Sequence, residues 1–593
     1  MTSWPRRQTV RHLVERRTGW ILVVAAALVS ACGGPAAPQR TDGGVPQQAA
    51  PQRTKVLNVG VTGSVPALSI AGGSSPVGGW VAMTEMHTDG LITADINAHR
   101  PVGRLAERVP SLDDGSISLL PDGRMKVVFN LRNGITWQDG VPFTADDLVF
   151  SYQIGGPGGL PTSANDAAEF MSSVEAPDPR TFVIYYREPY NLGAALGPLM
   201  FWPLPQHLLG DAYERFAASK NLDDLLKDPY WTTGYVKTGA FRLTSFDPGA
   251  GIDFQAYDGY YLGRPKIDII HVRIFNDDAT LLANILAGAV DLTPELALRQ
   301  ATGVPLQNQW KSSGEGTVFV ADNAIRYLEP QMRPGVQIEP AVLDARVRTA
   351  IYYAFDIEAL SDAVNGGNPQ LAAWSLLPKT DPLYELTKDA YRQFGYNPER
   401  AKALLQELGW TMGSDERVHN NADGRAFRTS IWASLGTDEE IAAYASYWRR
   451  VGLEVEEHVS SAAESRDQSA RAQFPGWDIF SGEVSGTIGQ VAASPQTRWT
   501  GNRNGFEDPQ GMRLASAFRT ALTPTDRAQA MKAINDYVIG NMLILPTFYQ
   551  AVWMAAGKGV KVYDDLAGGY GAHVGANGYW GSWYRNAYLW DLE

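Results

Sequence analysis

The chain has 593 residues, 44% of them hydrophobic and 19% charged, and its formal net charge is −13. This composition is typical of globular domains and excludes a fibre. No apolar run after residue 32 reaches the ~20 residues that a membrane-spanning helix needs, which excludes a multi-span membrane protein. The acidic balance, without a basic patch, argues against a nucleic-acid partner, because affinity for nucleic acid depends on the neutralisation of phosphates.

The first 31 residues have the pattern of an export signal. Five arginines precede an apolar stretch from Gly19 to Ser30, which is too short to span a bilayer. The sequence Val29–Ser30–Ala31–Cys32 resembles the bacterial lipobox, in which cleavage leaves a diacylated cysteine as the first residue. Cys32 is the only cysteine of the chain. We predict a lipid anchor at Cys32, the alternative being an ordinary signal peptide with a chance cysteine.

Residues 32–53 are rich in proline, glycine, glutamine and alanine and contain almost no large apolar side chain. Such a segment cannot bury enough apolar surface to offset the conformational entropy lost on folding. We therefore predict a disordered tether between the anchor and the folded part of the chain.

Two early segments alternate apolar and polar residues in the manner of β-strands. The first is KVLNVGV (55–61) and the second is KVVFNLR (126–132). The pair Asp122–Gly123 before the second segment is typical of a hairpin turn. The sequence therefore predicts a first strand and, later, a hairpin.

Helical patterns appear further along the chain. Residues 343–360 place apolar side chains on one face after Asp344, which predicts one helix capped by that aspartate. In YNPERAKALLQELGW (396–410), Asn397 is the expected cap, a proline takes the first helical position, and Gly409 is the expected end.

Residues 439–459 change from a helical to a strand pattern across Gly452. Strands and helices are mixed along the chain without a short repeat. The fold class expected from these patterns is α/β or α+β with several subdomains.

The most informative segment is FNLRNGITWQDGVPFTADDLVFSYQI (129–154). It combines a strand, turns at Gly134 and Gly140, and a helix capped by Thr144, with Asp147 completing a capping box. This segment resembles the signature of the family 5 extracellular solute-binding proteins, the receptors of dipeptide, oligopeptide and nickel ABC importers. Caps and turns account for its aspartates, so we assign them no catalytic or metal role.

Further segments resemble other parts of the same family and follow in the same order. They match its Gly-Thr-Gly-Pro-Tyr strand, its Pro-x-Ile-Asp segment, its Ala-Gly-x-x-Asp turn and a segment near the C-terminal end. The resemblance covers essentially all of the chain after the tether. These segments are KTGAFRL (237–243), YDGYYLGRPKIDIIHVRI (257–274), LAGAVDL (286–292) and LILPTFY (543–549).

The resemblance implies an α/β fold with two lobes of the type II periplasmic-binding-protein kind, an extra subdomain inserted in the first lobe, and a cleft that closes on its ligand by hinge motion. An importer's receptor must stay outside the membrane and near its permease, which a lipid and a flexible tether accomplish. The expected domains are the signal peptide 1–31, the tether 32–53, lobe I in 54–92, 232–295 and 546–593, the inserted subdomain 93–231, and lobe II 296–545.

By position within the resemblance, four tryptophans lie in regions that border the family's cleft. They are Trp80, Trp374, Trp477 and Trp499. Aromatic side chains line many ligand clefts, so each of the four is a candidate for ligand contact, with core packing as the alternative.

Peptide-binding members generally carry Gly-Trp-x-x-Asp in the last of these regions, where the aspartate pairs with the peptide's α-amine. Here the corresponding residues are GEVSG (482–486), and Gly486 stands in place of the aspartate. A buried ammonium without a carboxylate is unfavourable, so this difference weakens the peptide interpretation. Glu483 is the candidate replacement, the alternative being a surface or turn glutamate. Arg498 and Arg503 are candidate partners for a ligand carboxylate, and Arg498 is favoured. We expect Arg503, within GNRNGF, in a solvated turn.

Signatures of catalysis and of metal binding are absent from the sequence. It contains no Gly-x-Ser-x-Gly elbow and no His-Glu-x-x-His, and the histidines after residue 31 show no short ligand spacing. We therefore expect no enzyme, no cofactor and no metal, although a pair of carboxylates of the glycosidase type stays open.

The expected function is that of a lipid-anchored, monomeric receptor on the outer face of the bacterial cytoplasmic membrane or in the periplasm. Such a receptor delivers a peptide or peptide-like solute to the permease of an ABC importer by closing its cleft. The alternatives are a receptor for an oligosaccharide or a metal chelate, or a sensor or chaperone with the same fold.

Overall fold

The computed structural model describes residues 54–63, 68, 83–95, 100–156, 166–198, 201–379, 381–434, 437–461, 464, 467–482, 503–562 and 583–593. The chain divides into two units, Met1–Arg53 and Thr54–Glu593, and all of the described residues belong to the second unit. The predicted signal peptide, Cys32 and the tether therefore lie outside the described residues. None of the described helices is long and apolar enough to cross a membrane.

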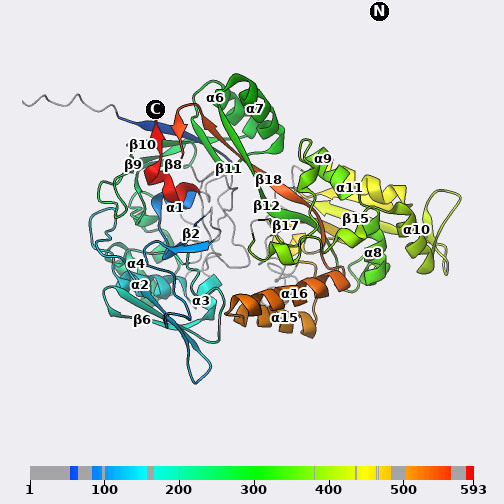
Figure 1. The fold of residues 1–593 in the computed structure, drawn as a ribbon, viewed down its shortest axis with the longest axis horizontal. Coiled ribbons are helices and arrows are strands. Elements are labelled where there is room, and N and C mark those ends of the chain that lie inside the picture. Colours follow the sequence, from blue (N-terminus) through cyan, green and yellow to red (C-terminus); the bar gives the residue numbers. More distant parts are fainter. Residues whose placement is uncertain are drawn as a thin grey trace, which may run out of the picture. The chain divides into compact units, whose positions relative to one another are not determined.

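A mixed sheet of ten strands forms the framework of the second unit (Figure 1). The predicted first strand is confirmed as β1, which buries the alternate residues Leu57, Val59 and Val61 and runs parallel to β10. The order across the sheet is β16 (Glu454–Val459), β15 (Arg428–Ala433), β17 (Trp477–Gly482), β12 (Gly316–Pro330), β18 (Leu545–Gly557), β11 (Leu292–Leu298), β1 (Val56–Thr62), β10 (Ile269–Phe275), β9 (Gly251–Ala256) and β8 (Phe241–Asp247).

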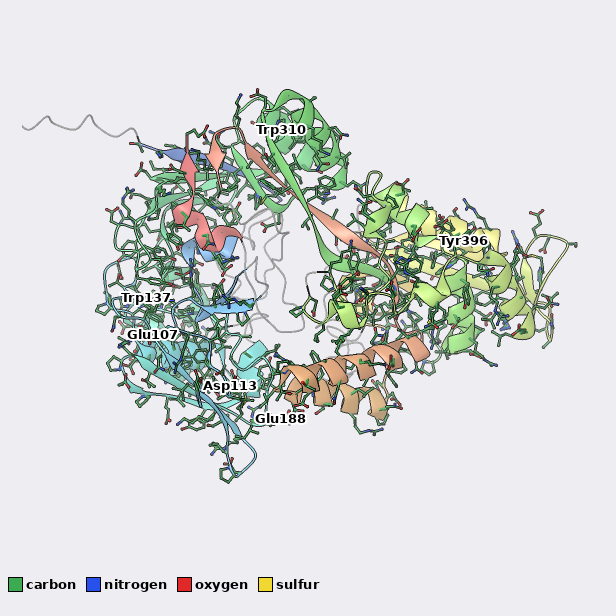
Figure 2. The ribbon with its side chains drawn as sticks, in the orientation of Figure 1. Glu107, Asp113, Trp137, Glu188, Trp310 and Tyr396 are labelled. Atoms are coloured by element: carbon green, nitrogen blue, oxygen red, sulfur yellow. The ribbon has the colours of Figure 1, made fainter. Side chains whose placement is uncertain are left out.

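Among the described residues, the buried hydrophobic side chains form four clusters. The lobe I cluster contains Leu57 and Ile270, and the lobe II cluster contains Tyr327 and Trp448. An insert cluster surrounds Trp137, and a small cluster around Trp310 packs α6 (Asp278–Leu286) and α7 (Gln300–Ser313) against the sheet. Figure 2 labels Trp137 and Trp310, which lie in these two separate clusters.

Two long strands connect the lobe I and lobe II clusters. β12 has 15 residues and β18 has 13, and they pair antiparallel along most of their length. Tyr327 of β12 belongs to the lobe II cluster, whereas Val552 of β18 belongs to the lobe I cluster. Between these positions the pairing shifts register, from Asp322 to Ile325. Because such irregularities bend and twist a strand pair locally, this ribbon is the candidate hinge between the lobes.

A separate antiparallel sheet carries the signature segment. Its order is β4 (Ile117–Leu119), β5 (Met125–Asn130), β7 (Thr181–Tyr186) and β6 (Met171–Asp178). The predicted hairpin is confirmed as β4–β5, and Gly123 in its turn has a φ of +88°. The helix that follows, α2 (Ala145–Gly155), begins as predicted, because the Asp147 carboxylate accepts the Thr144 backbone N–H at 3.0 Å. The domain boundaries given above stay predictions.

The single helix predicted over 343–360 is wrong. The structure has two helices there, α8 (Ala345–Tyr353) and α9 (Ile357–Val364). Asp344 caps α8 as expected, accepting a backbone N–H at 2.8 Å. A second aspartate, Asp356, accepts the Ala359 N–H at 3.0 Å and starts α9. The apolar face continues through both helices, so the periodicity did not reveal the internal cap at Asp356. This cap divides the predicted helix without a proline or a glycine.

The other two predicted helices are confirmed. α10 (Pro398–Glu407) starts after Asn397, whose side chain accepts an N–H of the first turn at 2.9 Å. α11 (Asp438–Arg450) leads into β16 through Gly452. Gly409 and Gly452 have φ values of +86° and +91°, which residues with a side chain rarely adopt, so each glycine ends its helix.

The last two long helices of lobe II, α15 (Pro509–Thr520) and α16 (Pro524–Gly540), pack on each other, and the end of α15 lies close to the insert. The Asn191 backbone N–H donates to the Arg519 carbonyl at 2.7 Å, and the Asn191 side-chain amide donates to the Phe518 carbonyl at 2.8 Å. Leu522 packs against the insert cluster. Lobe II thus contacts the insert at a place separate from the β12–β18 ribbon.

Candidate functional site

Most of the residues predicted to contact a ligand lie outside the described residues. They are Trp80, Glu483, Arg498 and Trp499, and Gly486 lies there too. Their assignment stays a prediction. Trp374 and Trp477 are described, and so are the residues that flank 483–502 on both sides.

Trp477 is the first residue of β17 and is fully buried. The centre of its ring lies 5.2 Å from that of Trp448 on α11, which is also fully buried. In the sheet it pairs with Pro330 on one side and Ile431 on the other. A ring enclosed in this way offers no surface to a solute in this structure, so the observed contacts of Trp477 are those of a core residue.

Trp374 is half-buried and packs against the edge of the lobe II cluster. The guanidinium carbon of Arg392 lies 4.9 Å from the centre of its ring. The Trp374 carbonyl accepts the Tyr391 N–H at 3.0 Å, which fixes the backbone. A cation over an aromatic face is an attractive contact, so this ring already has a polar neighbour. Trp374 and Trp477 therefore have different partners, and the structure does not stack them on each other.

A buried ion cluster, made by Asp478, Arg471, Arg503 and Glu329, holds the two chain segments that flank 483–502. The fully buried Asp478 carboxylate lies 3.0 Å from the guanidinium groups of both Arg471 and Arg503. Arg503 is 8% exposed, so the solvated turn expected for it is wrong. Its charge stays inside because Asp478 pairs with it and the Phe480 ring lies 3.8 Å from its guanidinium carbon.

Glu329 of β12 brings a second carboxylate to the ion cluster. It is fully buried, and the nearest guanidinium nitrogen, on Arg503, lies 3.5 Å from its carboxylate. Burial raises the pKa of the Glu329 carboxyl to about 7; the attraction of Arg503 opposes this shift, and the repulsion of Asp478 adds to it. Glu329 therefore exchanges its proton near neutral pH, whereas free glutamate does so well below it.

Arg326 of β12 supports the same region and was not identified from the sequence. Two of its nitrogens donate to the Glu440 carboxylate at 2.7 Å each, and the third donates to the Ser481 hydroxyl at 2.8 Å. Ser481 lies two residues before Glu483. Arg326 and Glu440 are 114 positions apart in the chain, so no local pattern indicated this pair.

In lobe I, Lys237 lies among aromatic rings and is 3% exposed. Its ammonium nitrogen is 5.0 Å from the centre of the Tyr235 ring and 5.5 Å from that of Tyr230. Burial lowers the pKa of the Lys237 ammonium to about 7, and burial together with Lys237 lowers the pKa of the neighbouring His87 imidazole to about 3. The only signal in the sequence was a single lysine in the aromatic stretch YWTTGYVKTGAF.

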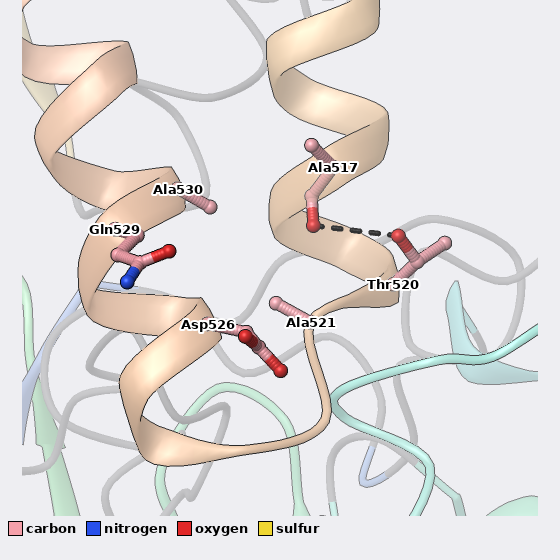
Figure 3. Close-up of a pocket in the computed structure, with 6 residues that line it drawn as sticks. All are labelled: Ala517, Thr520, Ala521, Asp526, Gln529 and Ala530. Atoms are coloured by element: carbon pink, nitrogen blue, oxygen red, sulfur yellow. Dashed lines mark hydrogen bonds between the residues drawn. The ribbon is translucent and has the colours of Figure 1, made fainter.

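A pocket of about 450 Å³ lies between α15 and α16 (Figure 3). Thr520 donates from its hydroxyl to the Ala517 carbonyl at 3.3 Å, and the Asp526 carboxylate accepts the Thr523 hydroxyl at 2.7 Å. Because these polar groups already have partners within the two helices, we do not favour this pocket as a solute site. In the part of the chain that the structure describes, no group of three or more histidine, cysteine, aspartate and glutamate side chains could hold a metal ion.

The model of the bacterial extracellular solute-binding proteins, family 5, matches residues 101–506. The chain belongs to this family. The match begins before the signature segment of the insert and extends through β12 and β17 past Arg503. The fold of this family 5 protein is accordingly the two-lobed α/β fold with an inserted subdomain that the sequence implied.

Individual relatives and solved structures agree with this assignment. A protein of Brucella ovis carries the name of a putative ABC transporter peptide-binding protein. It is 27% identical to this chain over 326 residues, which are 54% of each of the two chains. The family 5 protein thus spans about half the length of this relative. The oligopeptide-binding protein of Thermus thermophilus, solved with a pentapeptide, superposes with a TM-score of 0.69 at 19% identity, covering 91% of this chain and 96% of that one. NikZ of Campylobacter jejuni, solved with Ni(L-His), gives 0.67 at 18% identity, covering 91% and 100%.

Proposed function

We propose that the chain is a monomeric, extracytoplasmic solute receptor that delivers its solute to the permease of an ABC importer and performs no catalytic step. The observation that carries this proposal is the family match over residues 101–506, together with a fold shared over 91% of the chain. The β12–β18 ribbon supports closure by hinge motion, because it is a narrow connection with a register shift between two separate clusters.

The solute that we propose is a peptide or a peptide-like molecule. The Brucella ovis relative and the pentapeptide complex of the Thermus thermophilus protein support this class. A non-peptide solute is the second candidate, because Gly486 stands where peptide receptors carry an aspartate and because the similar Campylobacter jejuni structure holds a metal chelate.

Binding of a defined panel tests the proposed solute class. We expect the chain to bind N-acetylated peptides more tightly than the same peptides with a free amine, because a buried free ammonium has no aspartate partner at 486. Titration calorimetry with both peptide forms and with oligosaccharides measures the preference, and small-angle scattering reports whether the bound chain becomes more compact. Tight binding of free dipeptides that acetylation abolishes would contradict the expected preference, and a scattering profile unchanged by a bound solute would contradict closure.

We further propose that residues 1–31 are removed on export and that Cys32 carries the lipid that holds the receptor at the membrane, with 32–53 as its tether. The expected result is that wild type incorporates labelled fatty acid and sediments with membranes, whereas Cys32→Ala incorporates none and is released. The replacement of Ser30 by alanine, which keeps a small residue before the cysteine, is the matched control and should behave as wild type. Equal membrane binding of Cys32→Ala and an unlabelled wild type would refute the anchor.

A further inference from the structure

Helix α15 of lobe II ends without a cap of its own. The last four carbonyls of an α-helix have no partner within the helix, and a left-handed residue after the end commonly provides one. The residue after α15, Ala521, is extended instead, with φ of −75° and ψ of 101°. Within the described part of the chain, the Arg519 carbonyl accepts a backbone N–H only from Asn191, at 2.7 Å. A residue of the insert thus completes a helix of lobe II.

The contact has a polar and an apolar part. Besides its backbone N–H, Asn191 uses its side-chain amide, which donates to the Phe518 carbonyl at 2.8 Å. The Phe518 side chain itself points into the lobe II cluster, where it is buried together with Ala515. Two residues after α15, Leu522 packs against the insert cluster. Each side therefore contributes one group that reaches across to the other.

The loop that carries Asn191 is fixed by the insert alone. The Tyr186 hydroxyl donates to the Gly193 carbonyl at 2.9 Å, and the Gly193 N–H donates to the Tyr190 carbonyl at 2.9 Å. The Tyr190 ring stacks on that of Phe170, with 4.4 Å between the ring centres. Because the loop depends on the insert and α15 depends on the lobe II cluster, the contact can break without unfolding either side.

The size and exposure of the contact also allow it to break. Asn191, Arg519 and Leu522 are all half-buried, so water can reach the two carbonyls once the surfaces separate. The β12–β18 ribbon, with its register shift, is the candidate hinge that such a separation needs. A few hydrogen bonds and one leucine are enough to bias a hinged pair of lobes without locking it.

We propose that Asn191 and Leu522 form a latch that holds lobe II against the insert in the chain without solute. The latch rests on the proposed hinge motion and goes beyond the proposed function, which requires closure only with a solute bound. A chain that is closed beforehand loses less free energy when it closes on a solute. The latch must open before a solute enters, so it also sets how often a solute can enter.

The first test replaces Asn191 by aspartate. This isosteric change removes the amide donor and places a carboxylate against two carbonyls at the negative end of α15. Asn133→Asp is the matched control, because it makes the same charge change at an exposed asparagine of the insert. Hydrogen exchange by mass spectrometry, without solute, follows the backbone amide of residue 191, which the variant retains. We expect this amide to exchange at least about tenfold faster in Asn191→Asp and at the wild-type rate in Asn133→Asp.

The second test removes the apolar part of the latch and leaves Asn191 intact. In Leu522→Ala we expect the amide of residue 191 to exchange about fivefold faster than in wild type, because both parts of the contact open together. Small-angle scattering of the solute-free chains should give a larger radius of gyration for Asn191→Asp than for Asn133→Asp. If Asn191→Asp fails to fold, Leu522→Ala decides.

Three results would overturn the latch. They are an amide of residue 191 without protection in wild type, an exchange rate unchanged by Leu522→Ala, and an equal radius of gyration for Asn191→Asp and Asn133→Asp. Because no solute is used, a failure of the proposed peptide class leaves this test intact. A failed latch would in turn leave the proposed receptor function standing, since a receptor can also close only when its solute binds.

Discussion

Replacement of Trp477 by alanine is expected to lower the free energy of unfolding by about 3–5 kcal/mol, because it removes a fully buried indole and leaves a cavity beside Trp448. Denaturant unfolding followed by circular dichroism measures this loss. Solute affinity should stay at the wild-type value below the shifted unfolding midpoint. This outcome would establish Trp477 as a core residue and remove it from the predicted ligand contacts.

Trp374→Ala is the matched control for that experiment. Trp374 is half-buried and loses the contact with Arg392, so its effect on stability should be clearly smaller. Two further results are informative. A Trp477→Ala chain with wild-type stability and lost solute binding would contradict the core assignment, and a loss of affinity confined to Trp374→Ala would support the predicted role of Trp374.

Replacement of Asp478 by alanine is expected to destabilise the chain by about 3–5 kcal/mol, because Arg471 and Arg503 then remain buried without their shared carboxylate. The same change should release the ends of the segment 483–502. Limited proteolysis should therefore cleave this segment faster in Asp478→Ala than in wild type, at temperatures where both chains stay folded. Equal stability and equal cleavage rates would show that the ion cluster does not hold the segment.

Glu329→Gln is the matched control within the same ion cluster, and its effect should depend on pH. Burial raises the pKa of Glu329 to about 7 in the folded chain, above its value in the unfolded chain, so the folded state holds the proton more tightly. The contribution of Glu329 to stability is therefore fully present at low pH and is lost as the pH rises from about 4.5 to 7. Glutamine lacks this dependence, so the stability of Glu329→Gln relative to wild type should rise over that interval and then level off.

Local patterns predicted much of the fold because the interactions that they represent are local. The caps at Asn397 and Thr144 and the glycine ends at Gly409 and Gly452 involve residues a few positions apart, and the structure has each of them. The prediction of a single helix over 343–360 failed because two local signals conflict there. The cap at Asp356 competes with a continuous apolar face, and periodicity alone does not reveal which of the two dominates.

The candidate site was far less accessible from the sequence, because its interactions connect distant positions. Arg503 was expected in solvent because its neighbours suggest a turn, whereas Asp478, 25 positions earlier, draws it into the interior. The sequence pattern did not indicate the buried position of Lys237, although the lysine lies in a segment that resembles the family. Only the fold shows that aromatic rings surround its ammonium group.

The composition of the two main hydrophobic clusters has a consequence for the order in which the lobes fold. The buried residues of the lobe II cluster all lie between Ile325 and Tyr549, so that cluster is continuous in sequence. The lobe I cluster joins Leu57 to Trp590 and therefore cannot be completed until almost the whole chain has been synthesised. Contacts between such distant positions form slowly because the intervening chain must first be closed into a loop. Lobe II should thus fold as an early unit, while β1 and its apolar partners stay exposed to aggregation until the C-terminal residues arrive.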